Sequence, residues 1–147
     1  MSFDQVTNIE NQEPNPLAPV PAGVVRIAGD AVDMELLNAF EELQSDDGSD
    51  LIVELIDLYL EDAPQRILAI REAAVATEWV LLKRATHNLK GSSANLGIRH
   101  VAETCKKLEG IACEHSPQGV GDLLQEMDHE FARASEALLL ERQRRLQ

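Results

Sequence analysis

The sequence predicts an all-α fold: an up-and-down antiparallel four-helix bundle with a short additional N-terminal helix. Between residues 33 and 138, apolar residues recur with the i, i+3, i+4, i+7 spacing of helices, and no segment alternates as a strand does. Hydrophobic residues make up 44% of the 147-residue chain but aromatic residues only 3%, and such an aliphatic interior suits helices better than sheets. Because the connections between the long helical segments are short, neighbouring helices are expected to be antiparallel.

A chain of this length is expected to form one domain, residues 31–147, preceded by a flexible tail, residues 1–30. The tail contains four prolines among polar and acidic residues and has no sustained periodicity. A short helical pattern follows Asp33 and consists of Met34, Leu36, Leu37, Phe40 and Leu43. The polar run 45–49 then predicts a turn.

Two long helices are expected next, over residues 50–76 and 78–96. The inward residues of the first are Leu51, Ile52, Leu55, Leu58 and Tyr59. Pro64 lies inside it, and proline removes a backbone donor and kinks or ends a helix. The second helix is expected to end at Gly97, because glycine readily adopts the left-handed conformation found there.

Two further amphipathic helices complete the expected bundle, with a turn at Pro117 and Gly119 between them. The apolar stripe of the first is Ile98, Val101, Ala102, Cys105, Leu108 and Ala112. The stripe of the second is Val120, Leu123, Leu124, Met127, Phe131, Ala134 and Leu138, after which the chain is expected to trail into the polar run 141–145. Cys105 and Cys113 lie about 12 Å apart along one helix, beyond disulfide reach, so both thiols are expected to be reduced and Cys105 to be a core residue.

The third helix carries a histidine on its polar side. Its expected buried stripe is Leu81, Ala85, Leu89, Ser92 and Leu96. His87 is two residues from both Ala85 and Leu89, so it should face solvent, with Lys90 and Gly91 one turn away on the same face. A glycine inside a helix costs about 1 kcal/mol relative to alanine, which suggests that something approaches closely there. The spacing alone fits equally a surface histidine beside a tolerated glycine.

The charge of the chain limits its partners. A net charge of −13 argues against nucleic acid, because phosphates would be repelled. Residues 83–107 nevertheless carry six basic residues and one acidic residue, a net charge of +5 against −18 elsewhere. This segment is either suited to steering an acidic partner or an ordinary solvated helix face. No apolar run approaches the roughly 18 residues of a membrane span and no signal peptide is recognisable, so a cytoplasmic protein is expected.

The stretch around the histidine resembles the signature of histidine-containing phosphotransfer (HPt) domains, in which a helical His precedes a hydrophobic-Lys-Gly run, small residues and a closing Gly. The matching residues are His87, Leu89, Lys90, Gly91, Ser92, Ser93 and Gly97. The resemblance covers most of residues 32–140, including the long helix before the motif (55–74) and the run 102–109 after it, and it favours a kink rather than a stop at Pro64. Thr86 and Tyr59 depart mildly from the family pattern.

The resemblance implies that His87 accepts a phosphoryl group from the phospho-aspartate of one receiver domain and passes it to another. Lys90 would offset the charge of that group, Gly91 would let the partner approach, and Ser92 or Ser93 would orient the group or simply pack. The residues expected to contact the partner are Lys83, Arg84, Asn88 and Arg99.

The expected partner is the receiver domain of a hybrid sensor kinase or of a response regulator, and the chain itself is expected to be a monomeric carrier without kinase activity. No carboxylate cluster is expected beside His87, so the chain should bind no cofactor and the receiver should supply Mg²⁺.

Two other classes of function stay open on the sequence. One is a helical module that binds receiver domains or another partner without being phosphorylated. The other is a metal-dependent enzyme, indicated only by the pair Glu126 and His129, whereas di-iron bundles use two Glu-x-x-His motifs. His100 and His115 lack ligand-spaced companions and are expected on the surface. The sequence contains no P-loop and no glycine-rich nucleotide site of the kind that histidine kinases carry, so ATP binding is not expected. It also lacks the Gly-x-Ser-x-Gly motif of serine hydrolases.

Overall fold

The computed structural model describes residues 31–43 and 50–147, and within these ranges every regular element is helical. The four long helices are α4 (Leu51–Val75), α5 (Trp79–Asn95), α6 (Arg99–Glu114) and α7 (Val120–Leu146); a short helix α3 (Met34–Ala39) and a 3₁₀ turn η1 (Phe40–Leu43) precede them. The predicted tail 1–30 and turn 45–49 lie outside the described residues. No helix of the described ranges is long and apolar enough to cross a membrane.

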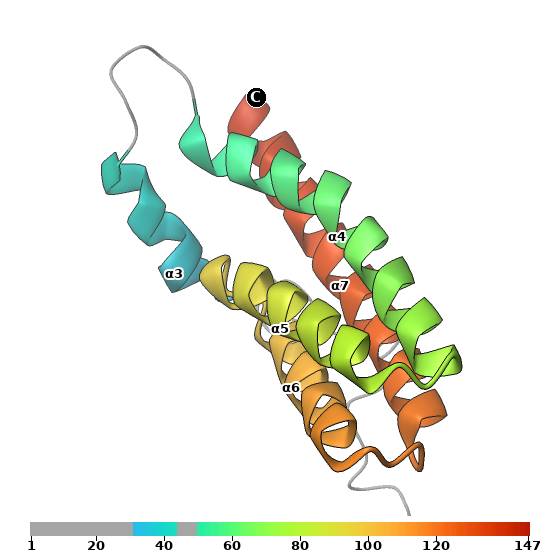
Figure 1. Cartoon of the computed structure of the whole chain (residues 1–147). Coiled ribbons are helices and arrows are strands. Elements are labelled where there is room, and N and C mark those ends of the chain that lie inside the picture. The colour runs from blue at the N-terminus through green and yellow to red at the C-terminus, as the bar shows by residue number, and fades with distance from the viewer. Residues whose placement is uncertain (1–30, 44–49) are drawn as a thin grey trace, which may run out of the picture.

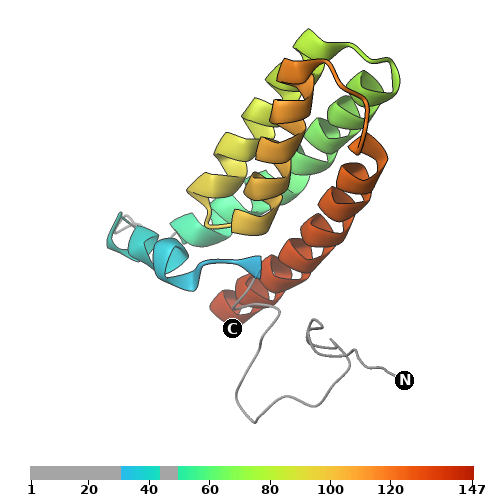
Figure 2. The ribbon, with the colours of Figure 1, turned by 90° about the horizontal axis from the view of Figure 1, so that it is seen from below.

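The four long helices form an antiparallel bundle in which each helix packs against the next along the chain and α7 closes the ring against α4 (Figure 1). Helix α3 lies at the end of the bundle where α7 finishes, as the second view shows (Figure 2). This arrangement confirms the predicted four-helix bundle with a short additional N-terminal helix. Pro64 lies on an exposed face of α4, and the helix continues through it as the family resemblance implied.

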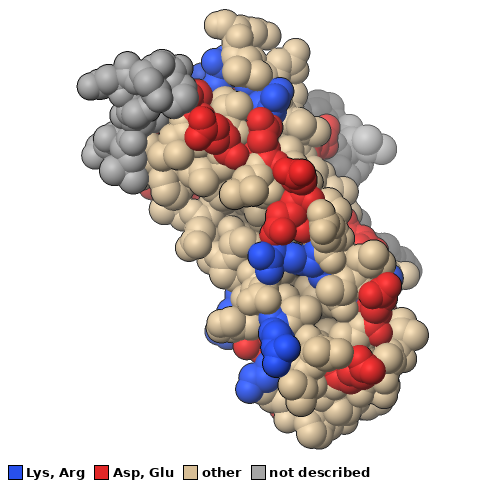
Figure 3. All heavy atoms as spheres, turned by 45° about the horizontal axis from the view of Figure 1, so that its top comes forward, with Lys and Arg blue, Asp and Glu red and all other residues tan. Residues whose placement is uncertain are grey.

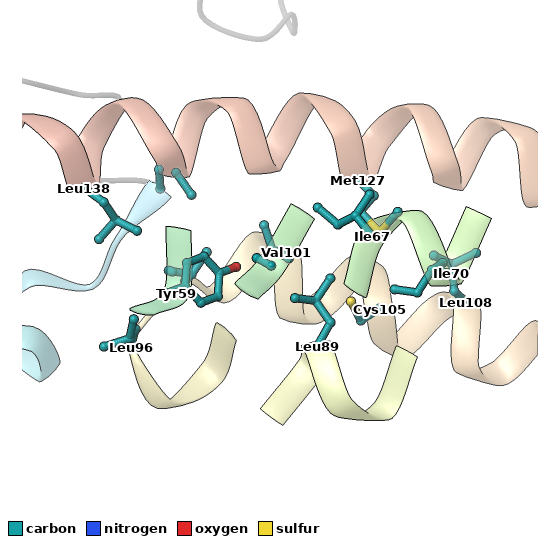
Figure 4. Close-up of a cluster of buried hydrophobic side chains, with 14 of the residues drawn as sticks. Tyr59, Ile67, Ile70, Leu89, Leu96, Val101, Cys105, Leu108, Met127 and Leu138 are labelled. Atoms are coloured by element: carbon teal, nitrogen blue, oxygen red, sulfur yellow. The ribbon is translucent and has the colours of Figure 1, made fainter. Parts of the chain in front are cut away.

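The core runs along the bundle axis and is almost entirely aliphatic (Figure 4). Its largest fully buried side chains are Leu37, Ile52, Ile56, Ile70, Leu82, Leu89, Ile98, Leu108, Met127 and Leu138. Burying such a side chain contributes about 1.5–3 kcal/mol, so this core is the main source of stability. Cys105 lies within the core as predicted, and burial raises the pKa of its thiol to about 12, which makes it an unreactive packing residue.

Two leucines predicted to face inward are instead exposed. Leu58 is 61% exposed and Leu81 is 47% exposed. In α5 the buried stripe is shifted by one position and consists of Leu82, Thr86, Leu89, Ser93 and Leu96. Leu89 and Leu96 were predicted correctly, but Leu82, Thr86 and Ser93 are buried in place of Leu81, Ala85 and Ser92. Thr86 can be buried because its Oγ1 donates to the carbonyl of Leu82 at 2.8 Å.

Glycine 97 ends α5 in the predicted left-handed conformation, with φ = 77°. A Cβ atom there would lie 2.9 Å from the backbone oxygen of Asp33, so the position also requires the absence of a side chain. The N–H of Asp33 donates to the carbonyl of Gly97 at 2.7 Å, while the Asp33 carboxylate caps the start of α3. This turn therefore attaches the N-terminal end of α3 to the bundle.

The last helix is longer than predicted, because the polar run 141–145 continues α7 instead of leaving it. The side chain of Arg145 is only 7% exposed. It donates to Glu141 at 2.7 Å on its own helix, to Glu41 at 2.7 Å and to Asn38 at 3.0 Å. Asp50, the N-cap of α4, lies 3.7 Å from it. We call this set of residues the Arg145 cluster; it holds the C-terminal end of α3 and the start of α4 against α7.

We predict that Arg145→Ala lowers the free energy of unfolding by about 2–4 kcal/mol, because it removes the buried guanidinium that joins Glu141 to Glu41 and Asn38. Arg144→Ala is the matched control, since Arg144 pairs with the same carboxylate but is 65% exposed; it should cost less than about 1 kcal/mol. Urea unfolding at pH 7 measures both. Equal losses would mean that the cluster does not stabilise the fold.

Candidate functional site

His87 lies in the middle of α5 with its side chain 66% exposed, as its spacing from the buried stripe predicted. Its neighbours Thr86 and Leu89 are fully buried, so the rotation of the helix leaves the imidazole on the outer surface. The site is thus positioned by the packing of α5 against α4 and α6.

A carboxylate from the next helix meets the histidine. Nδ1 of His87 lies 3.2 Å from Oε2 of Glu109 in α6, and Nζ of Lys90 donates to Oε1 of the same carboxylate at 2.7 Å. Glu109 is only 17% exposed. The hydrogen bond from Lys90, assisted by that from His87, holds the pKa of the Glu109 carboxyl below its usual value in spite of partial burial. Glu109 is therefore ionised at neutral pH.

The ionised carboxylate selects one form of the imidazole. Because it accepts a hydrogen bond, Nδ1 of His87 must carry the hydrogen, and in the neutral ring Nε2 then holds the free lone pair. No side chain of the described residues binds Nε2. The arrangement presents an oriented nucleophilic nitrogen to the solvent.

Sequence reasoning missed Glu109, because it expected no carboxylate cluster beside His87 and did not consider a single carboxylate that binds the imidazole. The two residues are 22 positions apart, and their contact depends on which faces of α5 and α6 meet. One signal was present: Glu109 follows Leu108 of the predicted core stripe, so it had to lie at the border of the helix face that meets a neighbour.

The small residues after the histidine have different surroundings. Gly91 is exposed, and a Cβ atom built on it would meet nothing within 4 Å. Ser93 is fully buried, with its Oγ 2.8 Å from the phenolic oxygen of Tyr59, so the structure places it in the packing role and not beside His87. Ser92 is half-buried, and its hydroxyl donates to the carbonyl of Leu89 at 3.2 Å.

The residues expected to contact a partner are only partly brought together. Lys83, Arg84 and Asn88 line a hollow of about 400 Å³ beside the histidine. Val80 and Glu109 complete its lining. Arg99 is exposed at the start of α6, beyond the C-terminal end of α5 and about 12 Å along the bundle from His87. On the face shown in Figure 3, Lys and Arg side chains gather in a few groups among acidic and uncharged residues.

A larger and mostly apolar groove of about 770 Å³ lies between α3, η1, α4 and the end of α5. Its lining residues are Leu36, Phe40, Leu55, Leu58, Tyr59, Asp62, Arg66, Ser92, Ala94, Asn95 and Leu96. Ala94 follows His87 by seven residues, two turns along the same helix face. One edge of the groove therefore lies on the face of α5 that carries His87, whereas Ser92, Asn95 and Leu96 line it from the side that faces α4. Leu58, which was expected in the core, is part of this groove.

The residues that indicated a metal site have other contacts. Glu126 accepts a hydrogen bond from Thr104 at 2.9 Å and lies 3.5 Å from the ammonium of Lys107, whereas His129 is exposed. Within residues 31–43 and 50–147, no group of three potential ligands is placed to hold a metal ion. His115 is exposed as expected and stacks on Trp79.

We predict that the Glu109 contacts contribute a pH-dependent part of the stability. A carboxyl whose pKa is lowered by folding stabilises the folded state above its unfolded pKa, near 4.5, and this contribution disappears as the pH falls through the lower folded-state value. The difference in unfolding free energy between wild type and Glu109→Gln should therefore be largest near neutral pH and shrink below pH 4.5. Urea unfolding from pH 7 to pH 3 measures it, with the exposed Glu103→Gln as control; a difference that is independent of pH would contradict the assignment.

The family comparison covers most of the bundle. A family model described as Hpt domain matches residues 54–141, more than half of the chain. Among curated proteins, the chain is similar to histidine-containing phosphotransfer protein 5 of Arabidopsis thaliana, with 28% identity over 100 residues, 64% of this chain and 64% of the relative. It is also similar to multistep phosphorelay regulator 1 of Schizosaccharomyces pombe, with 27% identity over 89 residues, 60% of this chain and 30% of the relative.

These matches span less than two thirds of either curated relative. Among solved structures, the fold is similar to the crystal structure of histidine-containing phosphotransfer protein B from Pseudomonas aeruginosa PAO1, with a TM-score of 0.70 and 29% identity. That similarity covers 78% of this chain and 96% of the other. From the family match, the four-helix bundle and the His-x-x-Lys-Gly run in α5, we conclude that the chain belongs to the Hpt domain family.

Proposed function

We propose that this chain is a phosphorelay carrier in which His87 accepts a phosphoryl group from the phospho-aspartate of one receiver domain and donates it to the aspartate of another. The observation that carries the proposal is an exposed imidazole whose Nδ1 is bound by the Glu109 carboxylate, leaving Nε2 free. Membership of the Hpt domain family supports it, because proteins of this family are phosphotransfer carriers that work with receiver domains of two-component systems.

The transfer follows from the form of the imidazole. The Nε2 lone pair attacks phosphorus, the bond between phosphorus and the aspartyl oxygen breaks, and the aspartate leaves as a carboxylate with the bonding electrons. The hydrogen stays on Nδ1, so the phosphorylated ring carries a positive charge that the Glu109 carboxylate offsets at 3.2 Å. Attack by the carboxylate of a second receiver reverses these steps and restores the neutral ring.

Lys90 holds the carboxylate in place for this chemistry through its hydrogen bond of 2.7 Å. It also places a positive charge one turn from the reacting nitrogen, which would reduce the repulsion between the anionic donor and Glu109. Both oxygens of Glu109 are occupied in this way, so the site lacks the free oxygen ligands that Mg²⁺ prefers. This supports the proposal that the receiver domain, and not this chain, holds the Mg²⁺ that the transfer needs.

We assign the apolar groove to the docking of the receiver. One edge of it, at Ala94, lies on the face of α5 that carries His87, and its mostly apolar lining includes the Asp62–Arg66 ion pair, a pattern suited to a protein partner. Gly91 follows His87 by one helical turn and leaves the backbone uncovered for close approach. The carrier would act as a monomer in the cytoplasm, where Cys105 and Cys113 stay reduced.

We predict that His87→Gln abolishes labelling by a phosphorylated receiver domain while changing the free energy of unfolding by less than about 1 kcal/mol, since the side chain is exposed. Radiolabel transfer and urea unfolding measure the two effects. Label that persists on the variant would place the acceptor elsewhere, with His100 the next residue to test. Wild-type protein that binds the receiver but never takes label would instead be a module that acts without being phosphorylated.

We predict that Gly91→Glu folds normally but accepts phosphoryl groups from the receiver at least about tenfold more slowly, because it puts an anionic side chain one turn from His87. Gly91→Ala is the matched control: it should keep transfer and stabilise the helix by up to about 1 kcal/mol. Circular dichroism and label transfer measure both variants. Full activity of Gly91→Glu would mean that the partner docks on another face.

A further inference from the structure

The free space beside His87 lies toward the N-terminal end of α5, away from Lys90. The hollow of about 400 Å³ is bounded by Lys83 and Arg84 in the preceding turn, and Lys90 is not part of its lining. Helical side chains lean toward the N-terminus of their helix, so the imidazole of His87 covers the turn that carries Lys83 and Arg84. A phosphoryl group attached to Nε2 would therefore lie beside the side chains of that turn.

The cations around His87 differ in what they already bind. Lys90 is neutralised by its contact of 2.7 Å with Glu109. Lys83 and Arg84 are both exposed, and neither has an ion-pair partner among the described residues. Glu109 also lines the hollow, but Lys90 balances its charge, so Lys83 and Arg84 leave the hollow with a net positive charge. The hollow therefore offers positive charge to an anion.

We propose that Lys83 and Arg84 form an anion subsite that holds the phosphoryl group while it is bound to His87. The inference rests on the proposed function. The guanidinium of Arg84 suits two oxygens of one phosphoryl group through parallel hydrogen bonds, and the ammonium of Lys83 adds a point charge from the adjacent position. Lys90 stays with Glu109, which binds Nδ1. One cation, Lys90, therefore helps to orient the imidazole, and two others, Lys83 and Arg84, hold the phosphoryl group.

A partner-free reaction tests the subsite without involving the docking groove. Phosphoramidate supplies the phosphoryl group directly: a bond forms between Nε2 and phosphorus, the phosphorus–nitrogen bond of the donor breaks, and ammonia leaves. ³¹P NMR then reports the amount of phosphohistidine at equilibrium and the pH at which its phosphoryl group loses its last proton. Nearby cations favour the dianion, so the wild-type titration should have the lower midpoint.

We expect Lys83→Ala and Arg84→Ala each to lower the equilibrium constant for phosphohistidine by about two- to fivefold, as for exposed ion pairs, and to raise the titration midpoint. The effects should fade in 1 M salt, where the screening length is only about 3 Å. Arg84→Lys should recover part of the loss, because it keeps the charge but not the paired donors. The matched controls are Lys107→Ala, on the side of α6 that faces Glu126, and Arg144→Ala at the far end of α7; both should behave as wild type.

The outcomes separate this inference from the proposed function. Wild-type protein that takes label at His87 while the Lys83 and Arg84 variants titrate like the controls would overturn the subsite and leave the carrier function intact. The same result together with slower transfer from a receiver domain would make these residues partner contacts and also overturn the subsite. Wild-type protein that takes no label at His87 from either donor would overturn the carrier function itself.

Discussion

The rotation of α5 about its own axis determines what the protein exposes. It is fixed from the buried side, where Leu82, Leu89 and Leu96 enter the core. The hydrogen bond of 2.8 Å between Ser93 and Tyr59 adds a specific contact to α4 that a purely aliphatic surface does not provide. A turn of the helix by one position would bury His87 or Asn88 and leave these two hydroxyls without partners, so the core holds the histidine outward.

The same rotation lets one carboxylate of α6 bind two side chains of α5. Glu109 accepts from His87 with one oxygen and from Lys90 with the other, which orients the ring and neutralises one cation at once. A carboxylate so engaged is a poor metal ligand and a good counter-charge for a ring that becomes positive when it is modified. The chemistry of the site therefore depends on a contact between helices more than on the order of residues within one helix.

Helical periodicity and turn residues were sufficient to predict the bundle, the left-handed Gly97 and the exposure of His87, because each depends on one segment at a time. The errors fall where two segments meet. Leu58 and Leu81 were expected inside because leucine is apolar, but Leu58 lines the open groove, and in α5 the buried face includes Thr86 and Ser93, whose hydroxyls find partners. Glu109 was missed for the same reason. The length of α7 was misjudged because Arg145 is buried there by contacts with residues some hundred positions earlier in the chain.

Helix α3 is too short to be stable alone, and its place at the end of the bundle depends on two anchors. One is the close contact of Asp33 with Gly97, where the absence of a side chain permits a backbone hydrogen bond of 2.7 Å. The other is the Arg145 cluster, which binds Asn38 and Glu41 at the opposite end. Leu36 and Phe40, which form one wall of the apolar groove, lie between these anchors. The shape of the groove therefore depends on an arginine from the end of α7 that does not line it, which links the C-terminal residues to the surface that we assign to partner docking.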